Sequence, residues 1–597
     1  MPRMNVITAS KAKDSKNTIR TLGTYLFPYK IQIMAVLIFA AISTVFSILG
    51  PKLLGKIITK LADGLVAYYL QTGLYMDFDY MGKMTMLLIL LYFISTFCSY
   101  IQNFIMTRVS MEVTFKLRKE ISQKMQKIPL NYYDTRTYGE VLSRITNDVD
   151  LVSQTLNQSL TQLITSITTI IGVFCMMLSI SVLMTVTALI VIPISLVIVN
   201  IIIKNSQGFF KAQQKSLGSL NGHVEEMYSG HNVIQAFNRQ AESVMQFENI
   251  NNDLCESAWK SQFVTSIMQP IMNFVGNLGY VLICILGGYL AVKKVVEIGD
   301  IQSFIQYMRN FTMPITQLAS ISNTLQQTIA AAERVFEFLD EEEEADDADQ
   351  IPEYEFHGNV EFKNIFFGYN PEKLIIHDFS AKIKQGQKIA IVGPTGAGKT
   401  TLVKLLMRFY DINSGEILID GHNIYNFKRN DLRALFGMVL QETWLYNASI
   451  LDNIRYGTFD ATKEEVIAAA KAAHCDEFIR TLPDGYDTIL NEEASNISQG
   501  QKQLFTIARV ILANPKILIL DEATSSIDTQ TEILIQKAMD SLMTGRTSFV
   551  IAHRLSTIKN SDLILVLKDG DIIEQGNHDE LLALNGFYAG LYNSQFE

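Results

Sequence analysis

This sequence of 597 residues contains few charged side chains. Charged residues make up 18% of it, against about 25% in an average soluble protein, whereas 48% of the residues are hydrophobic. A chain of this composition can bury ample apolar surface, which excludes intrinsic disorder. The apolar residues also fall in long runs, which argues against a wholly water-soluble protein.

Cysteine is scarce as well. The five cysteines are Cys98, Cys175, Cys255, Cys284 and Cys475. Their spacing matches neither a disulfide framework nor a zinc site. We therefore expect them to be small buried hydrophobic residues.

The two parts of the chain differ in charge. Residues 1–339 carry 27 Lys and Arg against 20 Asp and Glu, whereas residues 340–597 carry 23 against 40. Such asymmetry suggests two environments. The acidic second part has no basic stripe, which argues against a nucleic-acid partner.

Long uncharged stretches predict membrane spans. They are residues 31–51, 84–107, 151–203, 261–292 and 310–332. A spanning helix needs about 20 mainly apolar residues, so 151–203 can hold two spans joined by a tight turn near Ile180–Ser181. The prediction is six helices, at 29–50, 84–106, 159–179, 182–203, 267–290 and 300–323. The sixth contains Arg309, whose side chain could reach the outer lipid surface or contact cargo.

Basic residues gather at the N-terminus and in two long loops, 107–158 and 204–266. The positive-inside rule places these segments in the cytosol, in a multi-pass protein of the cytoplasmic membrane. We expect the loops to be charged helices that continue the spans as rods, rather than separate folded domains.

These patterns divide the chain into four regions. Residues 1–28 form a cytosolic N-terminal segment with an elbow helix, and 29–339 form the membrane domain. Residues 340–355 form an acidic linker, because 340–349 read DEEEEADDAD, and we expect it to be solvated. Residues 356–597 form a second domain.

Residues 388–401, KIAIVGPTGAGKTT, read as a buried strand, a glycine-rich loop and the start of a helix. The loop matches G-x-x-x-x-G-K-T, whose backbone N–H groups and helix N-terminus hold phosphates. Lys399 then reaches the β and γ oxygens, and Thr400 offers a hydroxyl to Mg²⁺. The candidate nucleotide-binding residues here are Gly393, Pro394, Thr395, Gly396, Ala397, Gly398, Lys399, Thr400 and Thr401.

Two further buried strands end in polar residues. Lys516–Leu520 precedes Asp521, a candidate Mg²⁺ ligand, and Glu522, a candidate general base for the attacking water. A third strand, 548–551, leads to His553, which can contact the γ-phosphate. Together with the phosphate-binding loop, these groups predict an ATPase that requires ATP and Mg²⁺.

The whole chain resembles an ABC exporter half-transporter, with a six-span α-helical membrane domain followed by an α/β P-loop ABC ATPase domain. The resemblance implies that Tyr369 stacks on adenine and that Gln441 is the Q-loop residue, a ligand of Mg²⁺ and a contact of the γ-phosphate. It identifies Asp528 with the D-loop and Glu492 with the X-loop. It extends to two cytoplasmic loops, at 132–148 and 233–237.

The signature motif departs from the family pattern. Ile497, Ser498, Gln499, Gly500 and Gln501 stand where LSGGQ is usual, and Asn491 and Ala494 replace X-loop glycines. In this family the signature of one chain completes the ATP site of another, so Gln499 predicts one weakened site. The chain thus resembles the degenerate-signature subunit of bacterial heterodimeric exporters. Its partner would carry an intact signature and a damaged catalytic base.

The resemblance implies ATP-driven export by alternating access. Scarce charge in the spans favours hydrophobic or amphipathic cargo such as drugs, dyes or lipids. Membrane lipids are expected as further partners, because they surround the spans. Two alternatives remain open, a homodimeric lipid flippase that tolerates Gln499 and a ligand-binding, ATP-gated sensor without transport.

Overall fold

The computed structural model describes residues 14–70, 77–345, 355–370, 373–440, 443–491, 496–521, 527–551 and 555–594. The chain divides into two compact units. The first consists of Met1–Lys127 and Arg136–Glu341, and the second of Ile128–Thr135 and Glu342–Glu597. The short segment Ile128–Thr135 thus packs with the second unit, although it interrupts the first in sequence.

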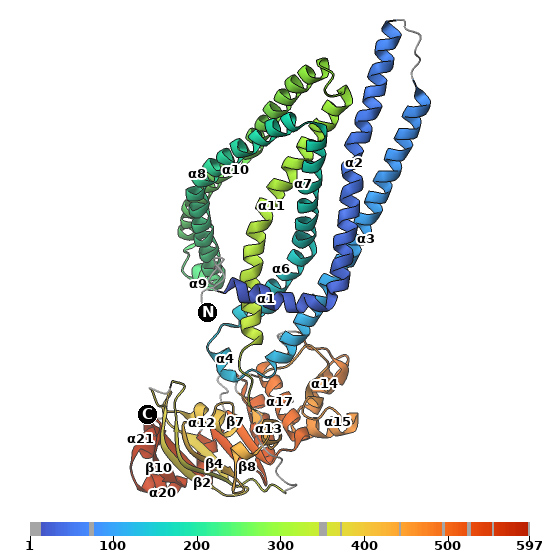
Figure 1. Ribbon diagram of the computed structural model, residues 1–597. Helices are drawn as coiled ribbons and strands as arrows, with labels where there is room; N and C mark the ends of the chain where they lie inside the picture. The colour runs from blue at the N-terminus through green and yellow to red at the C-terminus, as the bar shows by residue number, and fades with distance from the viewer. Residues whose placement is uncertain are drawn as a thin grey trace. The chain divides into compact units, whose positions relative to one another are not determined.

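Six long helices dominate the first unit (Figure 1). They are α2 (Lys30–Tyr69), α3 (Phe78–Met125), α7 (Leu160–Ile180), α8 (Val182–Ser229), α10 (Gln240–Val292) and α11 (Ile298–Leu339). Shorter elements are α1 (Ser15–Leu26), η1 (Phe27–Tyr29), α5 (Tyr138–Ser143), α6 (Val149–Gln154), α9 (His231–Ala236) and two π-helices, η2 (Arg144–Asp148) and η3 (Thr155–Ser159).

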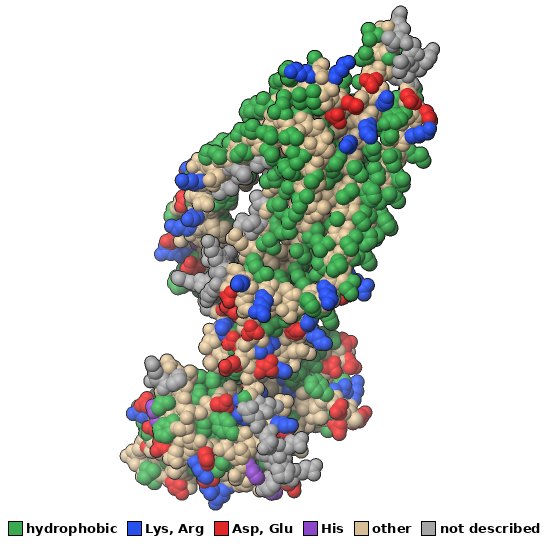
Figure 2. All heavy atoms as spheres, in the orientation of Figure 1, with side chains coloured by type: hydrophobic (Ala, Val, Ile, Leu, Met, Phe, Trp, Pro, Cys, Tyr) green, Lys and Arg blue, Asp and Glu red, His purple; other side chains and the backbone are tan. Residues whose placement is uncertain are grey.

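Each of the six predicted spans falls on one of the long helices. Within the described residues, four stretches are long and apolar enough to cross a membrane, namely Ser15–Tyr69, Phe78–Met125, Tyr138–Ile180 and Gln240–Val292. Helices α8 and α11 cover the other two predicted spans. Figure 2 shows hydrophobic side chains over the middle of the helices and charged side chains towards their ends.

The predicted turn between the third and fourth spans is confirmed. Ser181 is extended, with φ −161° and ψ 120°, and its side chain accepts a hydrogen bond from the Met184 N–H at the start of α8. The rod-like continuation of the spans is also confirmed, because α3 runs on to Met125 and α8 to Ser229.

Helix α11 packs against α2 and α7. The Tyr307 hydroxyl donates to the Ile48 carbonyl at 2.7 Å, and the Ser303 hydroxyl donates to the Pro51 carbonyl at 2.8 Å. These bonds satisfy two buried hydroxyls and join α11 to α2 near Pro51.

Two sequence expectations need correction. All five cysteines are free, but Cys175 and Cys255 are exposed, because they lie on outward faces of α7 and α10. The start of the linker is not simply solvated, since Glu344 is 16% exposed and pairs with Arg433 at 2.9 Å.

The second unit contains two sheets. The antiparallel sheet has the order β2-β1-β4-β5 and the mainly parallel one the order β10-β9-β3-β8-β7-β6. The strands are β1 (Val360–Phe367), β2 (Ile376–Ile383), β3 (Lys388–Val392), β4 (Ser414–Ile419), β5 (His422–Asn423), β6 (Phe436–Val439), β7 (Ile517–Asp521), β8 (Thr547–Ile551), β9 (Leu563–Lys568) and β10 (Asp571–Gly576).

Helices complete the second unit. They are α4 (Leu130–Asp134), α12 (Lys399–Leu406), α13 (Arg429–Ala434), α14 (Ile450–Arg455), α15 (Lys463–Ala472), α16 (Asp476–Thr481), α17 (Gln499–Ala513), α18 (Thr529–Met543), α19 (Leu555–Lys559), α20 (His578–Ala583) and α21 (Phe587–Ser594), with 3-10 turns η4 (Ile424–Asn426) and η5 (Gly485–Asp487).

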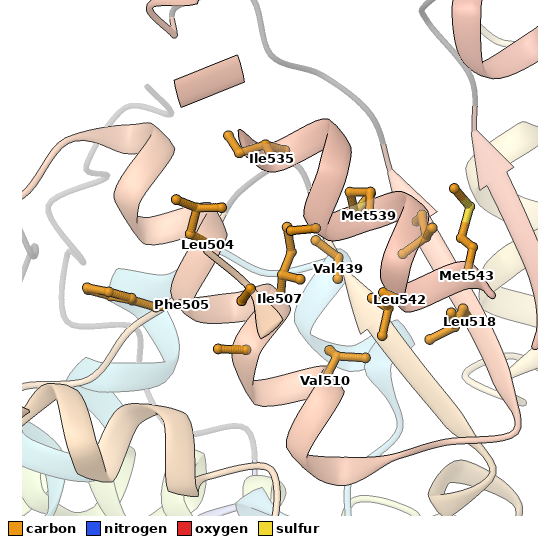
Figure 3. Packing of buried hydrophobic residues seen from close by; sticks show 14 of the residues in the cluster. Val439, Leu504, Phe505, Ile507, Val510, Leu518, Ile535, Met539, Leu542 and Met543 are labelled. Carbon is orange, nitrogen blue, oxygen red and sulfur yellow. The ribbon is translucent and has the colours of Figure 1, made fainter. Parts of the chain in front are cut away.

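Both faces of the parallel sheet are buried, as its apolar strands require. In β3, Ile389 and Ile391 join one core with the antiparallel sheet and α12, whereas Ala390 and Val392 face a second core. Figure 3 shows part of that second core, where α17 and α18 pack beside β7. Because β3, β7 and β8 run parallel, their carboxyl ends lie at the same edge of this sheet.

Candidate nucleotide-binding site

The loop Gly393–Gly398 joins β3 to α12 at this edge. Gly396 has φ +86°, a left-handed conformation that favours glycine. A Cβ at Gly393 would lie 2.2 Å from the Leu567 carbonyl oxygen. Pro394 and Thr395 are exposed, whereas Ala397 is buried. The loop therefore forms a tight cradle with an open outer face, which fits a bound phosphate chain.

Lys399 begins α12 and folds back over the loop. Its Nζ donates to the carbonyl oxygens of Gly393 at 2.7 Å and of Pro394 at 3.0 Å. Burial lowers the pKa of Lys399, and the negative charge of Asp521 opposes that shift. The lysine thus lies at the phosphate cradle and within the electrostatic influence of Asp521.

Asp521 is the last residue of β7, and Thr400 is exposed in the first turn of α12. A hydroxyl and a carboxylate are oxygen donors of the kind that Mg²⁺ prefers. Among the described residues, no group of three or more His, Cys, Asp or Glu is placed to hold a metal ion. Thr400 and Asp521 are the two described oxygen donors at this end of the sheet that could hold Mg²⁺.

Three predicted catalytic residues, Gln441, Glu522 and His553, lie outside the described residues. In the sequence each closely follows a parallel strand, namely β6, β7 and β8 respectively. The X-loop residues Glu492 and Ala494 also lie outside the described part of the chain.

Tyr369 lies beside α12. The residue is 42% exposed, and its ring packs edge-on against Tyr410 with 4.9 Å between ring centroids. Its hydroxyl lies 3.4 Å from the hydroxyl of Thr401, which is buried in α12. An exposed ring fixed next to the phosphate cradle is suited to stacking on a nucleobase.

The signature residues form a second group, at the start of α17. Ser498 caps this helix, since its hydroxyl accepts from the Gln501 N–H at 3.3 Å while Gln501 Oε1 accepts from the Ser498 N–H at 2.8 Å. Ile497 is buried. Gln499 is exposed, and its Nε2 donates to Thr443 Oγ1 at 3.4 Å.

Gly500 is buried and closely packed. A Cβ there would lie 2.4 Å from Thr531 Cγ2 and 3.0 Å from Ile527 Cγ2. Asp528 caps α18 by accepting a hydrogen bond from the Thr531 N–H at 2.9 Å. Hydrogen bonds from the backbone N–H and the side chain of Thr531 lower the pKa of Asp528. Residues of the predicted D-loop and signature therefore pack on each other.

One set of contacts at α4 is not predictable from the sequence. Asp134, at the end of α4, accepts hydrogen bonds from Lys404 at 2.9 Å and from Tyr410 at 2.5 Å. Burial opposes ionisation of Asp134, but these two donors outweigh it and lower its pKa. The Tyr132–Asp134 segment was noted as a loop motif, yet sequence alone does not identify partners about 270 residues away.

Comparisons with known proteins agree with this architecture. The family model described as the ABC transporter transmembrane region matches residues 33–315, and the one described as ABC transporter matches residues 376–525.

Similar proteins extend over nearly the whole chain. An uncharacterized ABC transporter ATP-binding protein, YfiC, of Bacillus subtilis is 42% identical over 594 residues, which cover 98% of this chain and 96% of YfiC. A fatty acid ABC transporter ATP-binding/permease protein of Mycobacterium bovis is 46% identical over 528 residues (88% and 83%). An ATP-dependent lipid A-core flippase of Syntrophus aciditrophicus is 37% identical over 511 residues (85% of each chain). The chain thus belongs to the ABC transporter family, as a membrane protein whose helical transmembrane region precedes an ATP-binding domain with ATPase activity coupled to transport.

Proposed function

We propose that this chain is one half of a heterodimeric exporter with one competent and one weakened ATP site. The observation that carries the proposal is Gln499, an exposed side chain at the first residue of α17. The first N–H groups of a helix have no partner within it and favour anions. A glutamine side chain at this point occupies space in front of those groups, where the family pattern has glycine.

The chain's own phosphate site is intact by contrast. Lys399 and the cradle Gly393–Gly398 would bind the β- and γ-phosphates, and Tyr369 would stack on adenine. Thr400, Asp521 and Gln441 would hold Mg²⁺, which offsets phosphate charge. Glu522 would accept the proton of the attacking water, and His553 would contact the γ-phosphate.

Two such sites form when the ATPase domains of two subunits meet head to tail. A partner with an ordinary LSGGQ would complete this chain's competent site. Ile497–Gln501 and Asp528 would complete the partner's site, which would hold ATP longer and hydrolyse it poorly. ATP drives the membrane domains between inward- and outward-facing states only through its different affinity for the two states.

The cargo that fits best is hydrophobic or amphipathic. The six predicted spans hold two basic residues, Lys30 near the start of the first and Arg309 in the sixth, and Arg309 is exposed on α11. The names of two similar proteins, which refer to a fatty acid and to lipid A-core, support lipids alongside drugs and dyes. We place the transporter in the cytoplasmic membrane, with its N-terminus and ATPase domain in the cytosol.

The oligomer is the most direct test. The complex is purified from its own host through a tag on this chain, and its mass is measured by native mass spectrometry. The proposal predicts one 67.2 kDa copy of this chain with a different ABC subunit. A species of two identical chains would overturn the heterodimer and favour a homodimeric flippase that tolerates Gln499.

Transport itself is tested in inverted membrane vesicles. ATP-dependent uptake of a fluorescent amphiphile, abolished by Glu522→Gln, is the expected result. Ligand-stimulated ATPase without any uptake would instead indicate the sensor.

A further inference from the structure

Tyr369, the residue predicted to stack on adenine, has a packed side and an open side. On the packed side its ring meets Phe367 edge-on, with 5.1 Å between ring centroids, and Tyr410 at an interplanar angle of 82°. The ammonium of Lys404 lies 5.9 Å from the centre of the same ring. Because Tyr369 remains 42% exposed, these neighbours hold the ring without covering the surface that would receive a base.

Two of these neighbours are bonded to one carboxylate. The Tyr410 hydroxyl donates to Oδ2 of Asp134 at 2.5 Å, and Lys404 Nζ donates to the same oxygen at 2.9 Å. Lys404 also lies 5.6 Å from the centre of the Tyr410 ring. Hydrogen bonds to an ionised group are shorter and stronger than bonds between neutral groups. Asp134 therefore fixes the ring that packs against Tyr369, and all these residues belong to the second unit.

The bonds of Asp134 contribute little to stability. Its side chain is 41% exposed and that of Lys404 is 29% exposed, and ion pairs that reach solvent are weak because water and salt screen them. The same bonds constrain Tyr410 strongly. A tyrosine bonded through its hydroxyl moves away from Tyr369 only by breaking a hydrogen bond to a charged group. The main consequence of these bonds is therefore the orientation of the two rings.

The orientation of the Tyr369 ring matters for a bound base. Two aromatic rings attract each other best in particular relative orientations, so the tilt of the protein ring changes the contact. An exposed side chain that is free to rotate must also be ordered when a ligand binds, and that ordering lowers the affinity. A ring held by Phe367 and Tyr410 is already ordered before the ligand arrives.

We propose that Asp134 and Tyr410 are positioning residues for the nucleobase. Asp134 fixes Tyr410, and Tyr410 holds the ring of Tyr369 in the orientation in which its exposed surface stacks on adenine. Both residues thus act on the nucleotide through Tyr369. The inference rests on the proposed function, because it requires ATP to bind at this chain's phosphate loop with its adenine on Tyr369.

The test is nucleotide binding to the purified transporter in nanodiscs. Radiolabelled azido-ATP, whose azide is on the adenine, is crosslinked on ice by ultraviolet light, and this chain is then recovered under denaturing conditions through its tag. Unlabelled ATP competes with the label, and so does inorganic tripolyphosphate, which offers phosphates without a base. When the label is well below its own dissociation constant, the competitor concentration that halves labelling equals the dissociation constant of the competitor.

Tyr410→Phe keeps the ring but removes its bond to Asp134, and it should weaken ATP binding about threefold. Asp134→Ala should do the same. The two changes together should weaken binding no further than either alone, because they remove one interaction. Asp134→Asn retains an acceptor oxygen for Tyr410 and should restore most of the affinity. Tripolyphosphate should bind all these variants equally, which also shows that the site is folded. In ATPase assays the KM for ATP should rise while kcat stays unchanged.

Tyr486→Phe is the matched control. The Tyr486 hydroxyl donates to Oδ1 of Asp476 at 2.7 Å, and Asp476 also pairs with Arg480 at 2.9 Å, so this change deletes the same kind of bond. Tyr486 packs in the core that contains Ala390, whereas Tyr410 packs against the core on the other face of the sheet. ATP and tripolyphosphate should both bind this variant as they bind the unaltered protein.

Tyr369→Ala separates the inference from the proposed function, and it should weaken ATP binding about tenfold. If it does so while Tyr410→Phe and Asp134→Ala bind ATP normally, the inference is overturned and the adenine contact stands. Equal weakening of ATP and tripolyphosphate would also overturn the inference, because the bonds of Asp134 would then shape the phosphate loop. Normal ATP binding by Tyr369→Ala would refute the adenine contact itself, and the inference with it.

Discussion

Two helices of the ATPase unit present their N-termini to nucleotide in the proposed assembly, and they are built differently. Helix α12 begins after Gly398, which has φ +97° and no side-chain cap. Helix α17 begins after Ser498, whose side chain and Gln501 cap each other's N–H groups. The start of α12 thus has no side chain bonded to its backbone N–H groups. At the start of α17, the Ser498 hydroxyl already accepts a hydrogen bond from the Gln501 N–H.

The same contrast holds for side chains. The loop before α12 leaves no room for a side chain at Gly393, because a Cβ there would meet the carbonyl oxygen of Leu567. The first residue of α17, in contrast, carries the exposed Gln499. In the proposed assembly, phosphate binding would therefore depend on backbone shape at α12 and on the side chain of Gln499 at α17. Four substitutions test this contrast, from the largest expected effect to the smallest.

Lys399→Met should have the largest effect. Removing the cation from the cradle takes away a charge aimed at the phosphates, so the ATPase rate of the purified complex should fall by about 100-fold or more. Lys382→Met is the control, because Lys382 is exposed and only pairs with Glu361 at the surface. Equal activity of the two variants would show that Lys399 does not act on the phosphates.

Gly500→Ala should mainly affect stability. The added methyl would meet Thr531 and Ile527 at distances that force α17 and α18 to shift, at a cost of about 2 kcal/mol. Differential scanning fluorimetry should show a lowered melting temperature. Gly396→Ala is the comparison. No atom lies within 4 Å of the carbon it adds, so any loss of stability should come from strain in the left-handed backbone. An unchanged melting temperature for Gly500→Ala would contradict the packing.

Gln499→Gly should strengthen ATP binding at the site that α17 would complete. Clearing the start of α17 lets its N–H groups reach the γ-phosphate, so the half-saturating ATP concentration for domain closure should fall about tenfold. Gln499→Asn keeps the amide on a shorter stem and should give an intermediate value. If all three proteins closed at the same ATP concentration, the side chain of Gln499 would not obstruct the site.

The fold was largely predictable because its signals are local. Uncharged runs predicted the long helices and the turn near Ile180–Ser181, and short apolar runs predicted the strands β3, β7 and β8. The π-helix η3 was not predictable, because an altered hydrogen-bond pattern over five residues leaves no distinct periodicity.

The parts of the site that depend on tertiary contacts were also missed. Nothing in the sequence pairs Asp134 with Tyr410, or shows that Gly500 is held by Thr531. Burial was misjudged at Cys175 and Cys255 because composition alone does not say which face of a helix turns outward.

Asp134→Asn should have the smallest effect. It tests a contact of α12, because Lys404 of α12 donates a hydrogen bond to Asp134 in α4. The carboxylate has a lowered pKa in the folded protein, so its stabilisation is present above the pKa of the unfolded chain and is lost as the pH falls through the folded value. Solvent screens this partly exposed group, so the loss at neutral pH should be below about 1 kcal/mol. Melting temperatures of the two proteins should differ by a few degrees at pH 7, and the difference should shrink as the pH falls below about 4 and vanish below the lowered pKa of Asp134. Asp150→Asn, which removes the exposed partner of Arg118, is the control. A difference that persists in acid would mean that Asp134 acts by packing and not by charge.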